Sequence, residues 1–181
     1  MNGYLSTIFL CIFASQFSYF AYSETLSYQE RVTIKVNVIG EPCDVDLDSE
    51  NITVDFGTIV DKYLYINTKS HIEPFTINLI NCDVEDGEGV KVSFVGQENM
   101  NLPGMLAVDS GSMASNIGIA ILDKNNLLIP INSETSIYML KNGDNSFPFK
   151  GYVQAEPDAI KNKNIELGSF TATASFILNY N

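Results

Sequence analysis

The last segment of the chain alternates between apolar and polar side chains with a single exception, Ile177. Successive side chains of a β-strand point to opposite faces, so this pattern predicts a strand with one apolar face. Such a strand needs a backbone partner along each edge. The sequence offers nothing after Asn181 to supply the next strand, and we therefore expect a strand from elsewhere to lie beside it. The apolar positions are Phe170, Ala172, Ala174, Phe176, Leu178 and Tyr180.

The opposite end of the chain predicts export. Residues 4–22 are apolar and aromatic, carry no charge, and end in the small-x-small pattern Ala21-Tyr22-Ser23. This is typical of a secretory signal, here residues 1–23, cleaved after Ser23. A membrane anchor is the alternative because the run is nearly long enough to span a bilayer, but its Ser, Gln and Tyr content disfavours a stable span.

Composition narrows the class of protein further. After removal of the signal, the chain is long enough for one domain with a real core. The net charge of −12 and the pI of about 4.3 exclude nucleic acid as a partner, because phosphates require a basic surface.

Two cysteines are expected to form a disulfide. Cys11 leaves with the signal, so Cys43 and Cys82 remain as an even pair in an oxidising compartment. A metal site is disfavoured because the spacing is long and the chain has a single histidine, His71.

The region from Cys43 onward predicts one strand after another and no convincing helix. Alternating or continuous apolar runs are separated by polar turn clusters, which favours an all-β sandwich of the immunoglobulin-like kind. Besides the last segment, the predicted strands are 51–57, 75–82, 90–96, 117–123, 136–140 and 147–153.

A search for chemistry finds no site. The acidic run between Asp83 and Glu88 partly resembles a calcium loop, but its spacing does not fit an EF-hand, and a solvated hairpin loop is favoured. His71 has no activated nucleophile context and no Gly-x-Ser-x-Gly elbow accompanies it. We therefore predict neither an enzyme nor a cofactor or metal site.

A second alternating segment precedes Cys43. Val32, Ile34, Val36 and Val38 alternate with polar or charged residues within residues 24–38. Two interpretations stay open. This segment pairs with the last strand of its own molecule, or it is donated to a neighbour whose last strand lacks a partner.

Taken together, these features resemble the subunits of chaperone–usher fimbriae of the type 1 and P-pilus class. The resemblance covers essentially everything after the signal. It rests on the order of an alternating extension before Cys43, the motif 51–57, the second cysteine in Asn-Leu-Ile-Asn-Cys82, Gly168 fourteenth from the end, and Tyr180 as the penultimate residue.

The resemblance implies a fold, partners and residue roles. The domain 39–181 would be a sandwich lacking its final strand, with a groove that a periplasmic chaperone fills before delivery to an outer-membrane usher. There the extension 24–38 of the next subunit would replace the chaperone, and the product would be a surface fimbria that supports cell adhesion. The donor positions implied are Tyr28, Val32, Ile34, Val36 and Val38; the groove strand is Gly168 with the six alternating residues from Phe170 to Tyr180.

The place of the subunit in the fimbria has alternatives. The chain has an extension and no room for a separate receptor-binding domain, which favours a minor or adapter subunit over a tip adhesin, with a major shaft subunit as the second choice. Outside this family, a self-contained secreted β-sandwich that binds a ligand remains the competing hypothesis.

Overall fold

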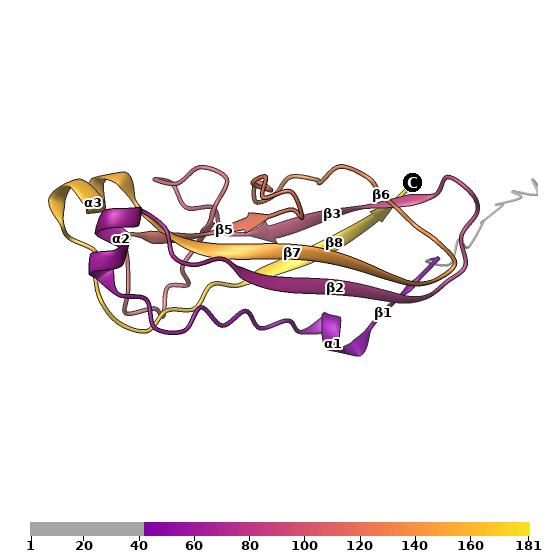
Figure 1. Cartoon of the computed structure of the whole chain (residues 1–181), viewed down its shortest axis with the longest axis horizontal. Coiled ribbons are helices and arrows are strands. Elements are labelled where there is room, and N and C mark those ends of the chain that lie inside the picture. Colours follow the sequence, from indigo (N-terminus) through magenta and orange to yellow (C-terminus); the bar gives the residue numbers. More distant parts are fainter. Residues whose placement is uncertain (1–41) are drawn as a thin grey trace, which may run out of the picture. The chain divides into compact units, whose positions relative to one another are not determined.

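The computed structural model describes residues 42–181, which form two β-sheets and three short helices (Figure 1). The predictions made for residues 1–41, including the signal and the donor positions, lie outside the described residues. The strands are β1 (Asp44–Val45), β2 (Glu73–Cys82), β3 (Gly89–Gly96), β4 (Leu106–Ala107), β5 (Ile117–Leu122), β6 (Tyr138–Met139), β7 (Gly143–Ala155) and β8 (Ala174–Tyr180).

The two sheets are antiparallel throughout. The first has the order β1-β2-β7-β5-β4, and the second has the order β6-β3-β8. Long β2 and β7 run side by side along the first sheet, and β3 and β8 form the centre of the second (Figure 1). The predicted all-β sandwich is confirmed.

The core lies between the sheets and is built by the strands' inward parity. Ile77 and Phe149 of the first sheet are fully buried, as are Val90 and Val92 of the second. Phe94 crosses the gap, and its ring meets that of Phe149 edge to face with centroids 5.1 Å apart. Aromatic pairs of this geometry add to the stabilisation from area burial.

Cys43 and Cys82 form the predicted disulfide. Cys82 closes β2, and Cys43 directly precedes β1, whose Asp44 and Val45 pair with the end of β2. The cross-link therefore fixes the start of the described chain to one end of the first sheet.

Three short helices differ from the prediction of an all-strand chain. They are α1 (Leu47–Glu50), α2 (Asp61–Asn67) and α3 (Pro157–Asn162). Each lies in a connection, and α2 and α3 both end at a residue in the left-handed conformation, Thr68 and Lys163. Helices this short receive their stability from packing, here through buried Leu64 and Ala159, and little from intrinsic propensity.

Among residues 42–181, no helix combines the length and the apolar character needed to cross a membrane.

Candidate functional site: an unpaired strand edge

The C-terminal strand β8 has a backbone partner on one side only. It pairs with β3 over its whole length, from Ala174 opposite Gly96 to Tyr180 opposite Val90. Since β8 ends the sheet order, its second edge has no strand beside it in the described part of the chain. A regular strand with an unpaired edge is a template for another strand.

The inward side chains of β8 are less well covered than those of its neighbour. Ala174, Phe176, Leu178 and Tyr180 pack against the core but are only half-buried. On β3, by contrast, Val92 is 0% exposed. The apolar layer thus thins out toward the free side of β8.

The stretch before β8 extends this edge. Residues 169–173, predicted as part of the strand, are not a strand; their hydrogen bonds go to a loop instead. Asp109 and Met113 donate backbone N–H groups to the carbonyl oxygens of Thr171 and Ser169, both at 2.8 Å. Phe170 and Ala172, outside those pairs, are half-buried against the core. We call the unpaired side of residues 169–180 the open edge.

Gly168 begins the open edge for a steric reason. Its φ is +148°, and a Cβ placed there would lie 2.5 Å from the Cβ of Met113. Any side chain would therefore displace the loop that holds residues 169–173, which accounts for glycine at this position.

A second unpaired segment, residues 52–59, is extended but is not the strand that the sequence predicted. It makes no backbone–backbone hydrogen bond with the rest of the described chain. Its alternation is nevertheless real, because Ile52, Phe56 and Ile59 pack against the core while Thr53 and Asp55 are exposed. Phe56 reaches as far as β7, where a Cβ on Gly151 would come within 3.2 Å of its ring.

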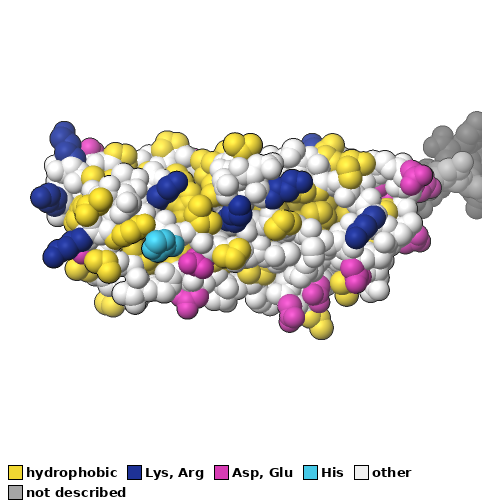
Figure 2. Space-filling view, in the orientation of Figure 1, with side chains coloured by type: hydrophobic (Ala, Val, Ile, Leu, Met, Phe, Trp, Pro, Cys, Tyr) yellow, Lys and Arg dark blue, Asp and Glu magenta, His cyan; other side chains and the backbone are white. Residues whose placement is uncertain are grey.

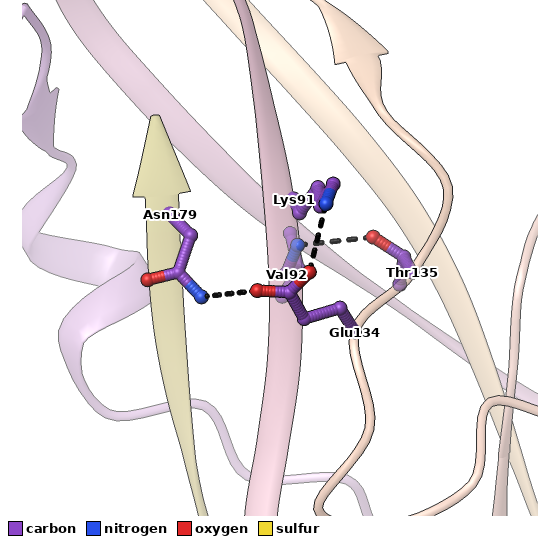
Figure 3. Close-up of polar contacts among 5 residues, drawn as sticks. All are labelled: Lys91, Val92, Glu134, Thr135 and Asn179. Atoms are coloured by element: carbon purple, nitrogen blue, oxygen red, sulfur yellow. Dashed lines mark hydrogen bonds and ion pairs between the residues drawn. The ribbon is translucent and has the colours of Figure 1, made fainter. Parts of the chain in front are cut away.

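The outer face of β8 is held to the rest of its sheet by Glu134. Its carboxylate accepts a hydrogen bond from Asn179 Nδ2 at 3.0 Å and one from Lys91 Nζ at 2.9 Å (Figure 3). The next residue, Thr135, accepts a hydrogen bond at Oγ1 from Val92 N at 3.0 Å. Lys91 and Asn179 are opposite one another in the β3–β8 register, so one carboxylate bridges both strands.

These contacts make the β3–β8 pairing acid-sensitive. The hydrogen bond and charge of Lys91, aided by Asn179, hold the pKa of the Glu134 carboxyl below its usual range. A carboxyl with a lowered folded-state pKa stabilises the fold above its unfolded pKa, and this contribution disappears as the pH falls through the folded pKa. We expect Glu134→Gln to lower the urea midpoint slightly at pH 7 and not at pH 3, because the group is exposed. Glu50→Gln, at an exposed glutamate without such contacts in the described chain, is the matched control; equal pH dependence of the two variants would contradict the assignment.

The remaining sequence candidates carry no chemistry in the structure. His71 stacks on Tyr63 with centroids 5.0 Å apart. The acidic run is a loop between β2 and β3, where Glu85 N donates to the carboxylate of Glu88 at 3.0 Å. Within residues 42–181, no group of His, Cys, Asp and Glu is arranged to hold a metal.

Comparison with known proteins identifies the family. The model of the family described as "Fimbrial protein" matches residues 32–181. PmfF of Proteus mirabilis, named as a minor fimbrial subunit, is 32% identical over 181 residues, covering 99% of this chain and 98% of that protein. The fimbrial adapter PapK of Escherichia coli is 37% identical over 155 residues, covering 82% of this chain and 86% of PapK.

The fold agrees with this result. The crystal structure of the P pilus rod subunit PapA matches with a TM-score of 0.68 at 23% identity, covering 78% of this chain and 100% of the other. The chain therefore belongs to the fimbrial protein family, and it is a structural subunit of a surface fimbria.

Proposed function

We propose that the open edge receives an extended segment from a neighbouring fimbrial subunit, and that residues 24–38 of this chain fill the same place in another subunit. The observation that carries the proposal is the half-buried row of β8 beside an edge without a partner. Residues 52–59, which also lack backbone partners, leave a second extended segment available to such a strand. Strand addition of this kind is established for fimbrial subunits and their chaperones in general.

The donor side chains are assigned by parity. Val32, Ile34 and Val36 would point into the acceptor, with Tyr28 and Val38 at the ends of the inserted segment. Burial of three aliphatic side chains is worth roughly 5–9 kcal/mol before entropic costs. Each ladder hydrogen bond adds about 1 kcal/mol, so the junction would be non-covalent and long-lived.

The family supports the remaining parts of the proposal. Residues 1–23 would direct export, residues 24–38 would be the donor segment, and residues 39–181 would be the sandwich that accepts a donor. A periplasmic chaperone would occupy the open edge before an outer-membrane usher receives the subunit. The role is structural and not enzymatic, with no cofactor.

A minor or adapter position in the fimbria is favoured. PmfF, named as a minor subunit, matches along nearly its whole length, and PapK, named as an adapter, has the higher identity. A rod position is the second candidate, because the major MR/P fimbria protein of Proteus mirabilis is 31% identical over 147 residues.

A pair of substitutions at adjacent positions tests the donor assignment. Ile34→Asp would force a carboxylate into the apolar acceptor, whereas Thr33→Asp would place the same charge toward solvent. We expect Ile34→Asp to prevent incorporation of the subunit into fimbriae, while Thr33→Asp has a mild effect, measured by the amount of subunit in sheared fimbriae. Equal damage from the two substitutions would favour a self-contained domain in which residues 24–38 form an internal strand.

A further inference from the structure

Charged side chains are segregated along the sandwich. Figure 2 shows basic side chains gathered at the end that carries α2 and α3, and acidic side chains at the opposite end. We call the first the lysine end, defined by Lys62, Lys161 and Lys163, and the second the acidic end, defined by Asp44, Asp83, Glu85, Asp86 and Glu88.

The lysines of the lysine end are available to a partner. The ion pair of the described residues is Lys91–Glu134, so none of the three has a carboxylate within 4.0 Å. Two nearby glutamates are already engaged. Glu156 accepts hydrogen bonds from Asn99 and Asn101, and Glu166 accepts one from Ser115 Oγ at 2.6 Å.

The same end exposes apolar side chains. Ile66 of α2 is 80% exposed, one turn after Lys62 on the same helix face, and Tyr63 beside them is 37% exposed. Val60, directly before the helix, is 55% exposed. Leu64 points the opposite way, into the core. An unpartnered face with apolar side chains rimmed by lysines fits a protein partner with exposed carboxylates.

The open edge runs from one of these ends to the other. At the start of this stretch, Ile165 N donates to Tyr65 Oη of α2 at 3.1 Å, which places it at the lysine end. At its finish, Asn181 N donates to Gly89 O at 3.0 Å, next to Glu88 at the acidic end. A donor strand lying along the open edge must therefore leave the acceptor at one end or the other.

The donor's own body follows its strand closely. Val38 and Pro42 are separated by four residue steps, at most about 14 Å. Pro42 already belongs to the acidic end, because its carbonyl oxygen accepts a hydrogen bond from Asp83 N at 2.8 Å. Wherever the donor strand ends, the acidic end of the donor subunit must therefore be close by.

We propose, building on the function proposed above, that the lysine end with the exposed face of α2 is the docking surface for the acidic end of the next fimbrial subunit. This requires the donor strand to run antiparallel to β8. A parallel strand would bring the donor's carboxylates against Glu88 and its neighbours, where like charges repel within a Debye length of about 8 Å. The antiparallel arrangement replaces that repulsion by attraction, and it matches the pairing of every other strand in the sheet.

The test compares two donors on one acceptor. The acceptor is the fluorescently labelled full chain with Ile34→Asp, which should not donate. The donors are a second copy of the wild-type chain, which carries the acidic end, and a peptide of residues 24–38, which does not. Association is followed by anisotropy at 50 mM and 300 mM NaCl.

We expect Lys161→Glu with Lys163→Glu in the acceptor to slow association with the whole subunit about tenfold at the lower salt, and to leave peptide association within about twofold. The higher salt should remove most of the difference. Reversing Asp83, Glu85 and Asp86 to Lys in the donor should restore the rate. Lys124→Glu with Lys141→Glu is the control, because it changes the net charge equally away from the lysine end.

The outcomes separate the two proposals. If peptide and subunit associate and the lysine-end variant affects both equally, affects neither, or behaves as the control does, the docking surface is wrong while strand donation stands. If neither donor associates with the unsubstituted lysine end, strand donation fails and the docking surface fails with it.

Discussion

A chain in which residues 24–38 are moved to follow Asn181, joined by a short flexible linker, is expected to unfold at a much higher urea concentration than the chain that lacks them. The moved segment would pair with the open edge of its own molecule and cover the half-buried row Ala174, Phe176, Leu178 and Tyr180. Three buried aliphatic side chains supply roughly 5–9 kcal/mol before entropic costs, and tethering replaces a bimolecular association by an intramolecular one.

The linker also tests the direction of the strand. A connection of a few residues after β8 can form a hairpin and so permits antiparallel pairing, whereas parallel pairing needs a crossover of a dozen residues or more. The control carries Ile34→Asp in the moved copy, which we expect to return the urea midpoint to that of the chain without the segment. A midpoint that does not change on adding the unsubstituted segment would contradict the assignment of the open edge.

Much of the fold could be predicted because the strands' apolar parity is set by the core. The alternation in the last segment gave the correct inward row of β8, and the apolar runs at 75–82 and 90–96 matched β2 and β3 to within two residues. The disulfide followed from export and an even number of cysteines. Each of these signals is local, or depends on composition alone.

Pairing could not be read from the same signals. Residues 52–59 alternate as a strand does and bury one side, yet no backbone partner lies beside them in the described chain. Alternation reports which side chains are buried and not which edges are hydrogen-bonded. The loop around Asp109, which holds residues 169–173, is likewise recognised only in three dimensions, because these bonds join residues about sixty positions apart.

The short helices were missed for a related reason. The helix α2 spans only Asp61–Asn67, and its N-cap, Val60, offers no side-chain oxygen to the first turn. A seven-residue segment without a capping side chain gives little helical signal, and the packing of Leu64 decides the outcome. The exposed face of this helix, central to the docking surface proposed above, was therefore not accessible from the sequence pattern.

Replacing both cysteines, Cys43→Ala with Cys82→Ala, is expected to cost about 4 kcal/mol, because the bond closes a loop with a sequence separation of 39 residues. That is a large part of the 5–15 kcal/mol typical of a domain. A subunit whose edge is unoccupied has lost part of its core covering and should tolerate the change least, so we expect very little folded protein from the unextended chain.

The extended chain with its own donor segment allows the effect to be measured. Its urea midpoint should fall on adding a reductant, and the double alanine variant should match the reduced protein and not respond to reductant. Alanine is the appropriate replacement since both sulfurs are buried, at 3% and 5% exposure for Cys43 and Cys82, and serine would add the cost of a buried hydroxyl. Equal midpoints for the oxidised protein and the variant would mean that β1 is held to β2 by strand pairing alone, and that the cross-link contributes nothing to the stability of the acceptor.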